Sequence, residues 1–147
     1  MKLLLINGPN MNMLGIRQPE IYGTDTLETI ESLTVKKANE LGFDMDTFQS
    51  NHEGAIIDKI HEAYGVYDGI VINPAAYTHY SYAIADAISS VGIPAIEIHM
   101  SDIKNRESFR AESVTLPYCI GQVAGYGKES YAIGVEKLAD HLKKEQG

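Results

Sequence analysis

The chain has 147 residues, with 20 acidic and 12 basic side chains and a formal net charge of −8. This length matches one domain of ordinary size, so we expect a single domain spanning residues 1–147. The acidic balance argues against a nucleic-acid surface, which needs clustered Lys and Arg to neutralise phosphates. Because the apolar runs are too short to cross a bilayer and no charged-then-apolar leader precedes the first of them, we expect a cytoplasmic protein without a membrane partner.

Short apolar runs alternate with amphipathic helical patterns along the chain. Regular alternation with near-continuous apolar strands predicts a flavodoxin-like, three-layer α/β sandwich around a five-stranded parallel sheet of order 2-1-3-4-5. Thr26 is a candidate N-cap, and Gly42 and Gly65 close the first two helices. The predicted strands are 2–7, 43–50, 68–73, 94–99 and 117–125, and the predicted helices are 26–42, 51–65, 78–92 and about 128–144.

The side chains with special chemistry are few. Cys119 is the single cysteine and lies in an apolar segment, which favours a buried thiol over a catalytic one. All three Arg (Arg17, Arg106 and Arg110) fall in expected loops or short turns, whereas the Lys are spread mainly along expected helices. Since a guanidinium can bind a carboxylate or phosphate with two hydrogen bonds, this distribution suggests a small anionic ligand.

Nucleotide and serine-hydrolase motifs are absent. The segment GPNMNMLG after the first strand lacks the G-x-G-x-x-G spacing and opens a long loop instead of a helix. In GQVAGYGKE, five residues separate Gly121 from Gly127 where a phosphate loop has four, and Glu129 replaces the required Ser or Thr. No G-x-S-x-G turn occurs.

The end of the fourth strand carries the clearest acid-base pattern. Glu97 and His99 are two residues apart and so point to the same side of a strand, where a carboxylate can orient an imidazole for proton transfer. A purely structural ion pair is the alternative. Arg106 and Arg110 follow one helical turn apart, which suits an anion between them, although salt bridges to Glu107, Glu112 or another subunit would also explain them.

The third strand ends in a second polar group. Asn73 lies at the strand end, and His79 lies near the start of the helix predicted at 78–92. Asp86 is seven residues beyond His79, which predicts that both lie on one helical face. A cap or surface role is the alternative for His79. His79, Asp86, Glu97 and His99 are also possible metal ligands, but no compact ligand spacing supports a metal site.

The long loop after the first strand contains Arg17 and Tyr22. A tyrosine can act as a base near neutral pH only if a cation lowers its pKa, and Arg17 could supply that charge. Gly15, Pro19 and Gly23 allow defined bends, as a closing lid requires. A disordered loop with an ordinary tyrosine is the alternative.

Four segments together resemble the type II 3-dehydroquinate dehydratases of the shikimate pathway. They are LINGPNMNMLGIRQPEIYG, INPAAYTHYSYAIADAI, EIHMSDIKNRESFR and AGYGKESY, and they occur in the family's order and spacing. The resemblance covers nearly the whole chain. It implies an anti elimination of water from 3-dehydroquinate to 3-dehydroshikimate through an enolate, with no cofactor, metal or Schiff base, in a homododecamer of four trimers.

The resemblance also implies residue roles. Tyr22 would remove the C2 proton while Arg17 lowers the pKa of its hydroxyl, and Asn10 would hold the water that stabilises the enolate. His99 would protonate the departing hydroxyl, with Glu97 orienting it. Arg106 matches a position that organises the lid or a subunit contact, and Asp86 would act across a subunit boundary. The substrate-binding positions are Asn73, His79, Asp86, Met100, Ser101, Ile103, Arg106 and Arg110.

Several positions depart from the family pattern. Asp102 stands where Asn is common, Ala111 and Glu112 follow Arg110 where His is frequent, and Ser130 replaces a frequent Gly. We expect at most a weaker substrate affinity. The alternative hypothesis is a non-catalytic flavodoxin-like module that binds a small anion or a partner protein through the same loops. A Schiff-base lyase would need a lysine at the site, and only Lys104 lies near it.

Overall fold

The computed structural model describes residues 1–16, 20 and 24–146 and contains one five-stranded parallel sheet with four long helices in these ranges. The strands are β1 (Lys2–Asn7), β2 (Asp44–Gln49), β3 (Gly69–Asn73), β4 (Ala95–His99) and β5 (Gly121–Ala124). The long helices are α2 (Leu27–Glu40), α3 (Glu53–Glu62), α4 (Tyr82–Val91) and α5 (Glu129–Gln146). Short 3-10 turns form η1 (Met11–Met13), η2 (Ala75–His79), η3 (Ile103–Asn105), η4 (Ser108–Arg110) and η5 (Leu116–Tyr118).

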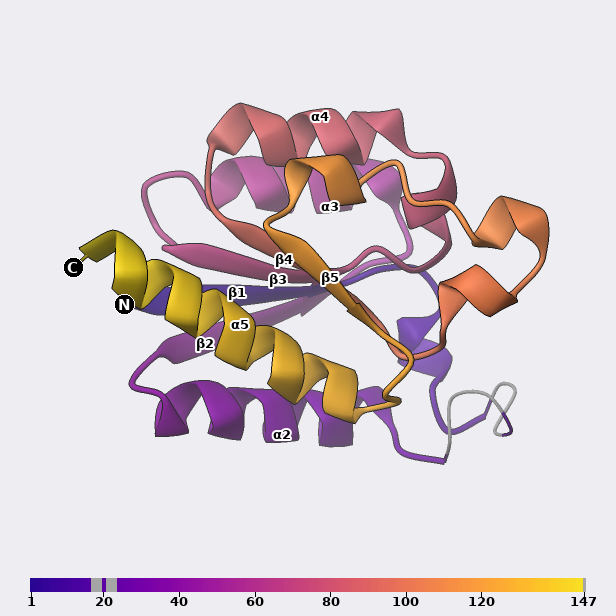
Figure 1. The fold of residues 1–147 in the computed structure, drawn as a ribbon, viewed down its shortest axis with the longest axis horizontal. Helices are drawn as coiled ribbons and strands as arrows, with labels where there is room; N and C mark the ends of the chain where they lie inside the picture. The colour runs from indigo at the N-terminus through magenta and orange to yellow at the C-terminus, as the bar shows by residue number, and fades with distance from the viewer. Residues whose placement is uncertain (17–19, 21–23, 147) are drawn as a thin grey trace.

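The strand order is β2-β1-β3-β4-β5 and every pairing is parallel, which confirms the predicted flavodoxin-like topology. Helices α2 and α5 cover one face of the sheet and α3 and α4 cover the other (Figure 1). The two termini lie at one end of the sheet, and the loops that follow the carboxyl ends of the strands lie at the opposite end (Figure 1). In such a sheet, ligands bind at that carboxyl end.

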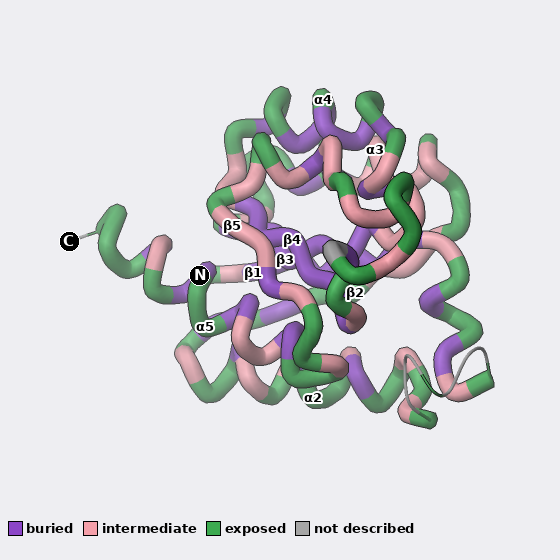
Figure 2. The backbone as a smooth tube through the Cα atoms, turned by 45° about the vertical axis from the view of Figure 1, so that its right-hand side comes forward, coloured by how far each residue is buried: buried purple, intermediate pink, exposed green. Residues whose placement is uncertain are grey.

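The strands are apolar on both sides because both faces of the sheet are buried. Leu3 and Leu5 belong to the core under α2 and α5, whereas Leu4 and Ile6 belong to the core under α3 and α4. Figure 2 shows the central strands buried between the two helical layers. Alternation along a strand therefore decides which layer each side chain contacts.

The helix predicted at 78–92 divides into two parts. Residues Ala75–His79 form η2, and α4 begins only at Tyr82, where the hydroxyl of Ser81 accepts a hydrogen bond from the backbone of Ile84. Because Tyr80 between them has φ −153°, the helix does not continue through it. The prediction that His79 and Asp86 share one helical face is therefore wrong.

The strand predicted at 117–125 is shorter than expected. Its first part forms η5, with a proline among its first residues, and β5 begins at Gly121. Pro117 has no backbone N–H for a strand ladder and is accommodated in a helical turn instead. The predicted N-cap is confirmed, since the side chain of Thr26 accepts from the backbone of Thr29. Within the described ranges, no helix combines the length and apolar character needed to span a membrane.

Cys119 follows η5 and is half-buried, so the prediction of a buried thiol holds only in part. Its Sγ lies 3.5 Å from the carbonyl oxygen of Thr115. Burial, helped by the charge of Glu97, raises the pKa of the Cys119 thiol to about 12. A thiol with that pKa carries little thiolate at neutral pH, which makes it a poor nucleophile.

Candidate active site

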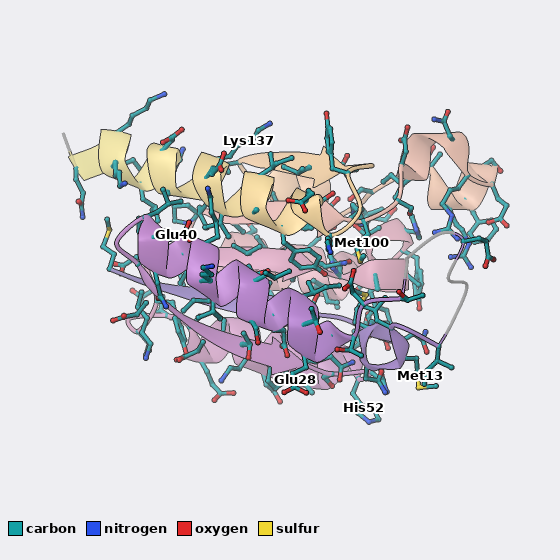
Figure 3. The ribbon with its side chains drawn as sticks, turned by 90° about the horizontal axis from the view of Figure 1, so that it is seen from below. Met13, Glu28, Glu40, His52, Met100 and Lys137 are labelled. Carbon is teal, nitrogen blue, oxygen red and sulfur yellow. The ribbon has the colours of Figure 1, made fainter. Side chains whose placement is uncertain are left out.

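A cavity of about 110 Å³ lies at the carboxyl end of the sheet. Figure 3 places Met13 and Met100 toward this end of the molecule and Glu40 toward the other. Most of the predicted site residues meet there, although they come from β3, β4, the 3-10 turns and the segments that follow β1 and β4. Those that line the cavity are Asn10, Asn73, His79, His99, Met100, Ser101, Ile103, Arg106 and Arg110.

Glu97 and His99 form the predicted pair at the end of β4. His99 Nε2 lies 2.9 Å from Glu97 Oε2, and the two residues are 5% and 0% exposed. A carboxylate can only accept, so Nε2 carries the hydrogen and Nδ1 remains the ring nitrogen available to a ligand. His99 lines the cavity and Glu97 lies behind it. The arrangement orients an imidazole for proton transfer.

Glu97 is surrounded by hydrogen-bond donors besides His99. Gln122 Nε2 donates to Oε2 at 2.7 Å, Ser113 Oγ lies 3.0 and 2.9 Å from the two carboxylate oxygens, and Thr115 Oγ1 donates to Oε1. Burial alone would raise the pKa of Glu97, but hydrogen bonds from His99, Thr115 and Gln122 outweigh it and lower the pKa to about 2. Glu97 is therefore ionised at every physiological pH.

His79 lines the same cavity from η2. Its Nδ1 lies 2.7 Å from the carbonyl oxygen of Glu112, so Nδ1 is the donor and Nε2 is left as an acceptor. Burial lowers the pKa of His79, and the positive fields of His99, Arg110 and Arg106 lower it further against the opposing carbonyl contact. A neutral His79 can thus accept a hydrogen bond from a ligand hydroxyl.

The two predicted arginines do not share one helix, because Arg106 directly follows η3 and Arg110 ends η4. Arg106 Nη1 is 3.4 Å from Ser101 Oγ, and Arg110 Nε is 2.8 Å from Glu107 Oε2 in an ion pair that lacks hydrogen-bond alignment. The salt bridge to Glu107, which the sequence left open as the alternative to anion binding, is thus present for Arg110. Both arginines still line the cavity, which gives this wall a positive charge suited to an anionic ligand.

The residues just after β1 line the cavity next to β3. Asn10 has φ 68°, and its backbone N–H donates to Asn51 Oδ1 at 2.9 Å. Just before it, the N–H of Gly8 donates to the carbonyl of Asn73 at 2.8 Å. A Cβ at Gly8 would collide with the backbone of Pro74, so only glycine permits this approach.

The structure places one of the predicted substrate-binding residues away from this cavity. Asp86 is exposed on α4 and does not line it. Arg17 and Tyr22 lie outside the described residues. Within the described part of the chain, no three His, Cys, Asp or Glu side chains gather in a set that could hold a metal ion.

The sequence did not reveal several residues that line the cavity or hydrogen-bond to the side chains at its wall. Gln122 lies opposite Glu97 in the register of β4 and β5, and Ser113 and Thr115 reach Glu97 from the segment before η5. Ala75, with φ 55°, lines the cavity, and Tyr131 on α5 hydrogen-bonds to Asn73 beneath it. The pairing of β4 with β5 is a signal that could have identified Gln122. Ser113, Thr115 and Tyr131 had no such signal, because their contacts join segments with no local pattern in common.

Comparison with known proteins agrees with the geometry. Residues 1–139 match the family described as Dehydroquinase class II. The chain is 55% identical to a 3-dehydroquinate dehydratase of Bacillus cytotoxicus, over 96% of this chain and 97% of the relative. It is 52% identical to the enzyme of the same name from Bacillus mycoides, over 97% and 98% of the two chains.

Solved structures show the same likeness. The type II dehydroquinase of Butyrivibrio crossotus superposes with a TM-score of 0.91 at 51% identity, over 94% of this chain and 97% of that one. The type II dehydroquinase of Propionibacterium acnes gives a TM-score of 0.90 at 40% identity, over 95% and 96% of the two chains. The chain therefore belongs to the class II dehydroquinase family and is an enzyme of the hydro-lyase class.

Proposed function

We propose that this protein eliminates water from 3-dehydroquinate to give 3-dehydroshikimate, by anti elimination through an enolate and with neither metal nor Schiff base. The names of its relatives support the substrate. The observation that carries the proposal is the His99–Glu97 pair, which faces a small cavity also lined by Arg106 and Arg110. A carboxylate substrate with a leaving hydroxyl matches that combination of charge and acid.

In the proposed reaction, Tyr22 removes the proton next to the substrate ketone, assisted by the charge of Arg17. The electron pair of the broken C–H bond forms the enolate, and a water held by Asn10 stabilises its oxygen. As the enolate collapses, the C–O bond to the hydroxyl breaks, and His99 gives that oxygen a proton so that water leaves. Acid-base groups are sufficient because the proton removed is acidified by the neighbouring ketone.

The remaining groups position the substrate. The neutral Nε2 of His79 accepts from a substrate hydroxyl, and Arg110 with the backbone near Met100, Ser101 and Ile103 holds the carboxylate end. We place the reaction in the shikimate pathway, in the cytoplasm and in a dodecamer of four trimers, as the resemblance implies.

The ultraviolet absorbance of the conjugated enone product tests the proposal directly. Purified protein mixed with 3-dehydroquinate should raise this absorbance, and His99→Asn should reduce turnover at least about 100-fold, as expected for loss of a general acid. His141→Asn is a matched control, because His141 also contacts a glutamate, at 2.9 Å, but on the outside of α5. It should retain full activity.

Other outcomes would separate the alternatives. Binding of 3-dehydroquinate without product would favour the non-catalytic module. Inactivation by borohydride in the presence of substrate, or by a chelator, would contradict the metal-free mechanism without a Schiff base. Tyr22→Phe should abolish turnover and leave binding largely intact, and near-normal turnover would rule out the phenolate base.

A further inference from the structure

A buried chain of hydrogen bonds joins α5 to the floor of the cavity. The hydroxyl of Tyr131 donates to Asn7 Oδ1 at 2.6 Å and accepts from Asn73 Nδ2 at 2.9 Å. Asn73 Oδ1 in turn accepts from the backbone N–H of Ala75 at 3.0 Å. The side chains are sealed from solvent, with Tyr131 1%, Asn7 0% and Asn73 4% exposed.

The strand register explains why one tyrosine reaches both asparagines. Asn7 and Asn73 are paired partners at the ends of β1 and β3. They share the face of Leu5 and Val71, two residues earlier on each strand, which pack in the core beneath α5. A tyrosine on the first turns of α5 therefore meets two neighbouring amides at the carboxyl end of the sheet.

The backbone N–H of Ala75 can only donate, and this fixes the direction of the other hydrogen bonds between Asn73, Tyr131 and Asn7. The backbone N–H of Ala75 requires Asn73 to present Oδ1, which turns Nδ2 toward Tyr131. The tyrosine oxygen must accept from this amide, so its one proton goes to Asn7 Oδ1. Burial raises the pKa of Tyr131, which keeps that proton in place.

The hydrogen bond between Asn73 and Ala75, at the other end of this series of hydrogen bonds, lies at the wall of the cavity. Ala75 has φ 55°, a left-handed conformation that disfavours a residue with a Cβ, and it lines the cavity together with Asn73 and Ala76. It also begins η2, which carries His79. If the Asn73 amide turned over, its NH₂ group would face the N–H of Ala75, and this backbone would lose its acceptor.

We propose that Tyr131 is a positioning residue for the elimination reaction, which holds the Asn73 amide and the Ala75 backbone in the arrangement that receives substrate. The inference rests on the proposed function. Tyr131 acts through Asn73 and does not line the cavity. A residue that only filled the core would act through its ring, whereas the positioning role depends on its hydroxyl.

Tyr131→Phe separates these two roles because it keeps the ring and removes the hydroxyl. We expect kcat/KM for 3-dehydroquinate to fall about tenfold, mainly through KM, the loss expected when buried hydrogen-bond partners are left unpaired. Tyr67→Phe is the matched control, since the hydroxyl of Tyr67 donates to Asp46 at 2.5 Å and the residue precedes β3, at the opposite end of the sheet. Its kcat/KM should not change.

A double-mutant cycle tests whether the effect passes through Asn73. In an Asn73→Ala background, Tyr131→Phe should change kcat/KM less than about twofold. Asn7→Ala, which removes only the acceptor of the tyrosine proton, should raise KM by a few fold. An undiminished effect in the Asn73→Ala background, or a Tyr131→Phe enzyme with lower stability and unchanged KM, would overturn the proposal.

Hydrogen exchange at the Ala75 amide provides a readout that does not need turnover. We expect this N–H to exchange faster in folded Tyr131→Phe than in the parent or in Tyr67→Phe, because its acceptor is no longer held. If the parent enzyme does not convert 3-dehydroquinate, the proposed function fails while this measurement still decides the role of Tyr131. Equal exchange in all three proteins would show that the hydroxyl does not order this backbone.

Discussion

At the scale of single residues, the carboxylate of Glu97 is constrained by four neighbouring side chains. An ionised carboxylate is costly to bury unless its oxygens accept hydrogen bonds. Here Thr115 contacts Oε1, His99 and Gln122 contact Oε2, and Ser113 contacts both oxygens. Ser113, Thr115 and Gln122 are neutral donors, so their part in stabilising the Glu97 charge does not depend on the protonation state of His99.

Gln122→Met tests how far the stability of the protein depends on the ionised state of Glu97. The pKa of Glu97 is lowered from 4.5 to about 2, so the stability it contributes is complete above its ordinary pKa and is lost as the pH falls toward 2. Loss of the Gln122 donor raises the folded-state pKa of Glu97. We expect a free energy of unfolding about 1.5–3 kcal/mol lower at pH 7, the range for a hydrogen bond to a charged group, and acid unfolding that begins at higher pH.

Urea unfolding and acid titration, both followed by circular dichroism, measure these two changes. Gln146→Met at the exposed end of α5 is the control and should leave both unchanged. An acid-unfolding curve identical to that of the parent would mean that Gln122 does not stabilise the Glu97 charge.

At the scale of elements, local capping decides where the site-bearing turns end and the helices begin. Ser81 Oγ accepts from the N–H of Ile84 at 3.1 Å and donates to Glu53 Oε2 at 2.5 Å. One hydroxyl therefore starts α4 and joins it to α3. The chain before it remains free to form η2, which brings His79 into the cavity.

Ser81→Ala should cost more than the equivalent change at α2. Thr26→Ala removes an exposed cap, for which a loss of about 1 kcal/mol is expected. Ser81→Ala removes a buried cap together with the bond to Glu53, for which we expect about 2 kcal/mol. Chemical denaturation of the two variants gives the comparison, and equal losses would argue against the role of the Glu53 contact.

The junction between β1 and η1 allows a second element-scale prediction. Gly8→Ala would place a Cβ against the backbone of Pro74, which cannot move as a side-chain tip can. We expect a loss of about 1–3 kcal/mol in the free energy of unfolding, typical of overpacking. Gly54→Ala in α3 meets nothing within 4 Å and should instead stabilise by about 0.5–1 kcal/mol, the difference between Gly and Ala in a helix. A shift of the same sign in both variants would contradict this explanation.

At the scale of the whole molecule, one chain brings most of its predicted site together but leaves Asp86 outside. Asp86 is exposed on α4, away from the cavity lining. Exposed aromatic side chains, among them Tyr82 at 70% and Tyr118 at 49%, accompany it on α4 and η5. An assembly in which a neighbouring chain receives Asp86 would account for a predicted site residue in this position.

The proposed dodecamer has a measurable consequence. Sedimentation should give a species twelve times the chain mass of 16.2 kDa. Asp86→Ala should then lower kcat/KM although it alters no residue lining the cavity of its own chain, whereas Asp58→Ala, at an exposed position on α3, should not. A fully active monomer, or an Asp86→Ala enzyme with normal kcat/KM, would remove Asp86 from the site.

The local pattern of the sequence predicted the approximate positions of the strands and long helices and the Glu97–His99 pair. These features depend on residues a few positions apart, whose spacing fixes the face on which each side chain lies. The strand order followed from the regular alternation of strands and helices, combined with the rules for parallel sheets. The tertiary structure alone decided that α4 begins after Ser81, that Gln122, Ser113 and Thr115 hold Glu97, and that Tyr131 meets an asparagine 124 positions earlier in the chain. Such contacts arise from strand register and helix packing, which join segments whose local patterns carry no information about each other.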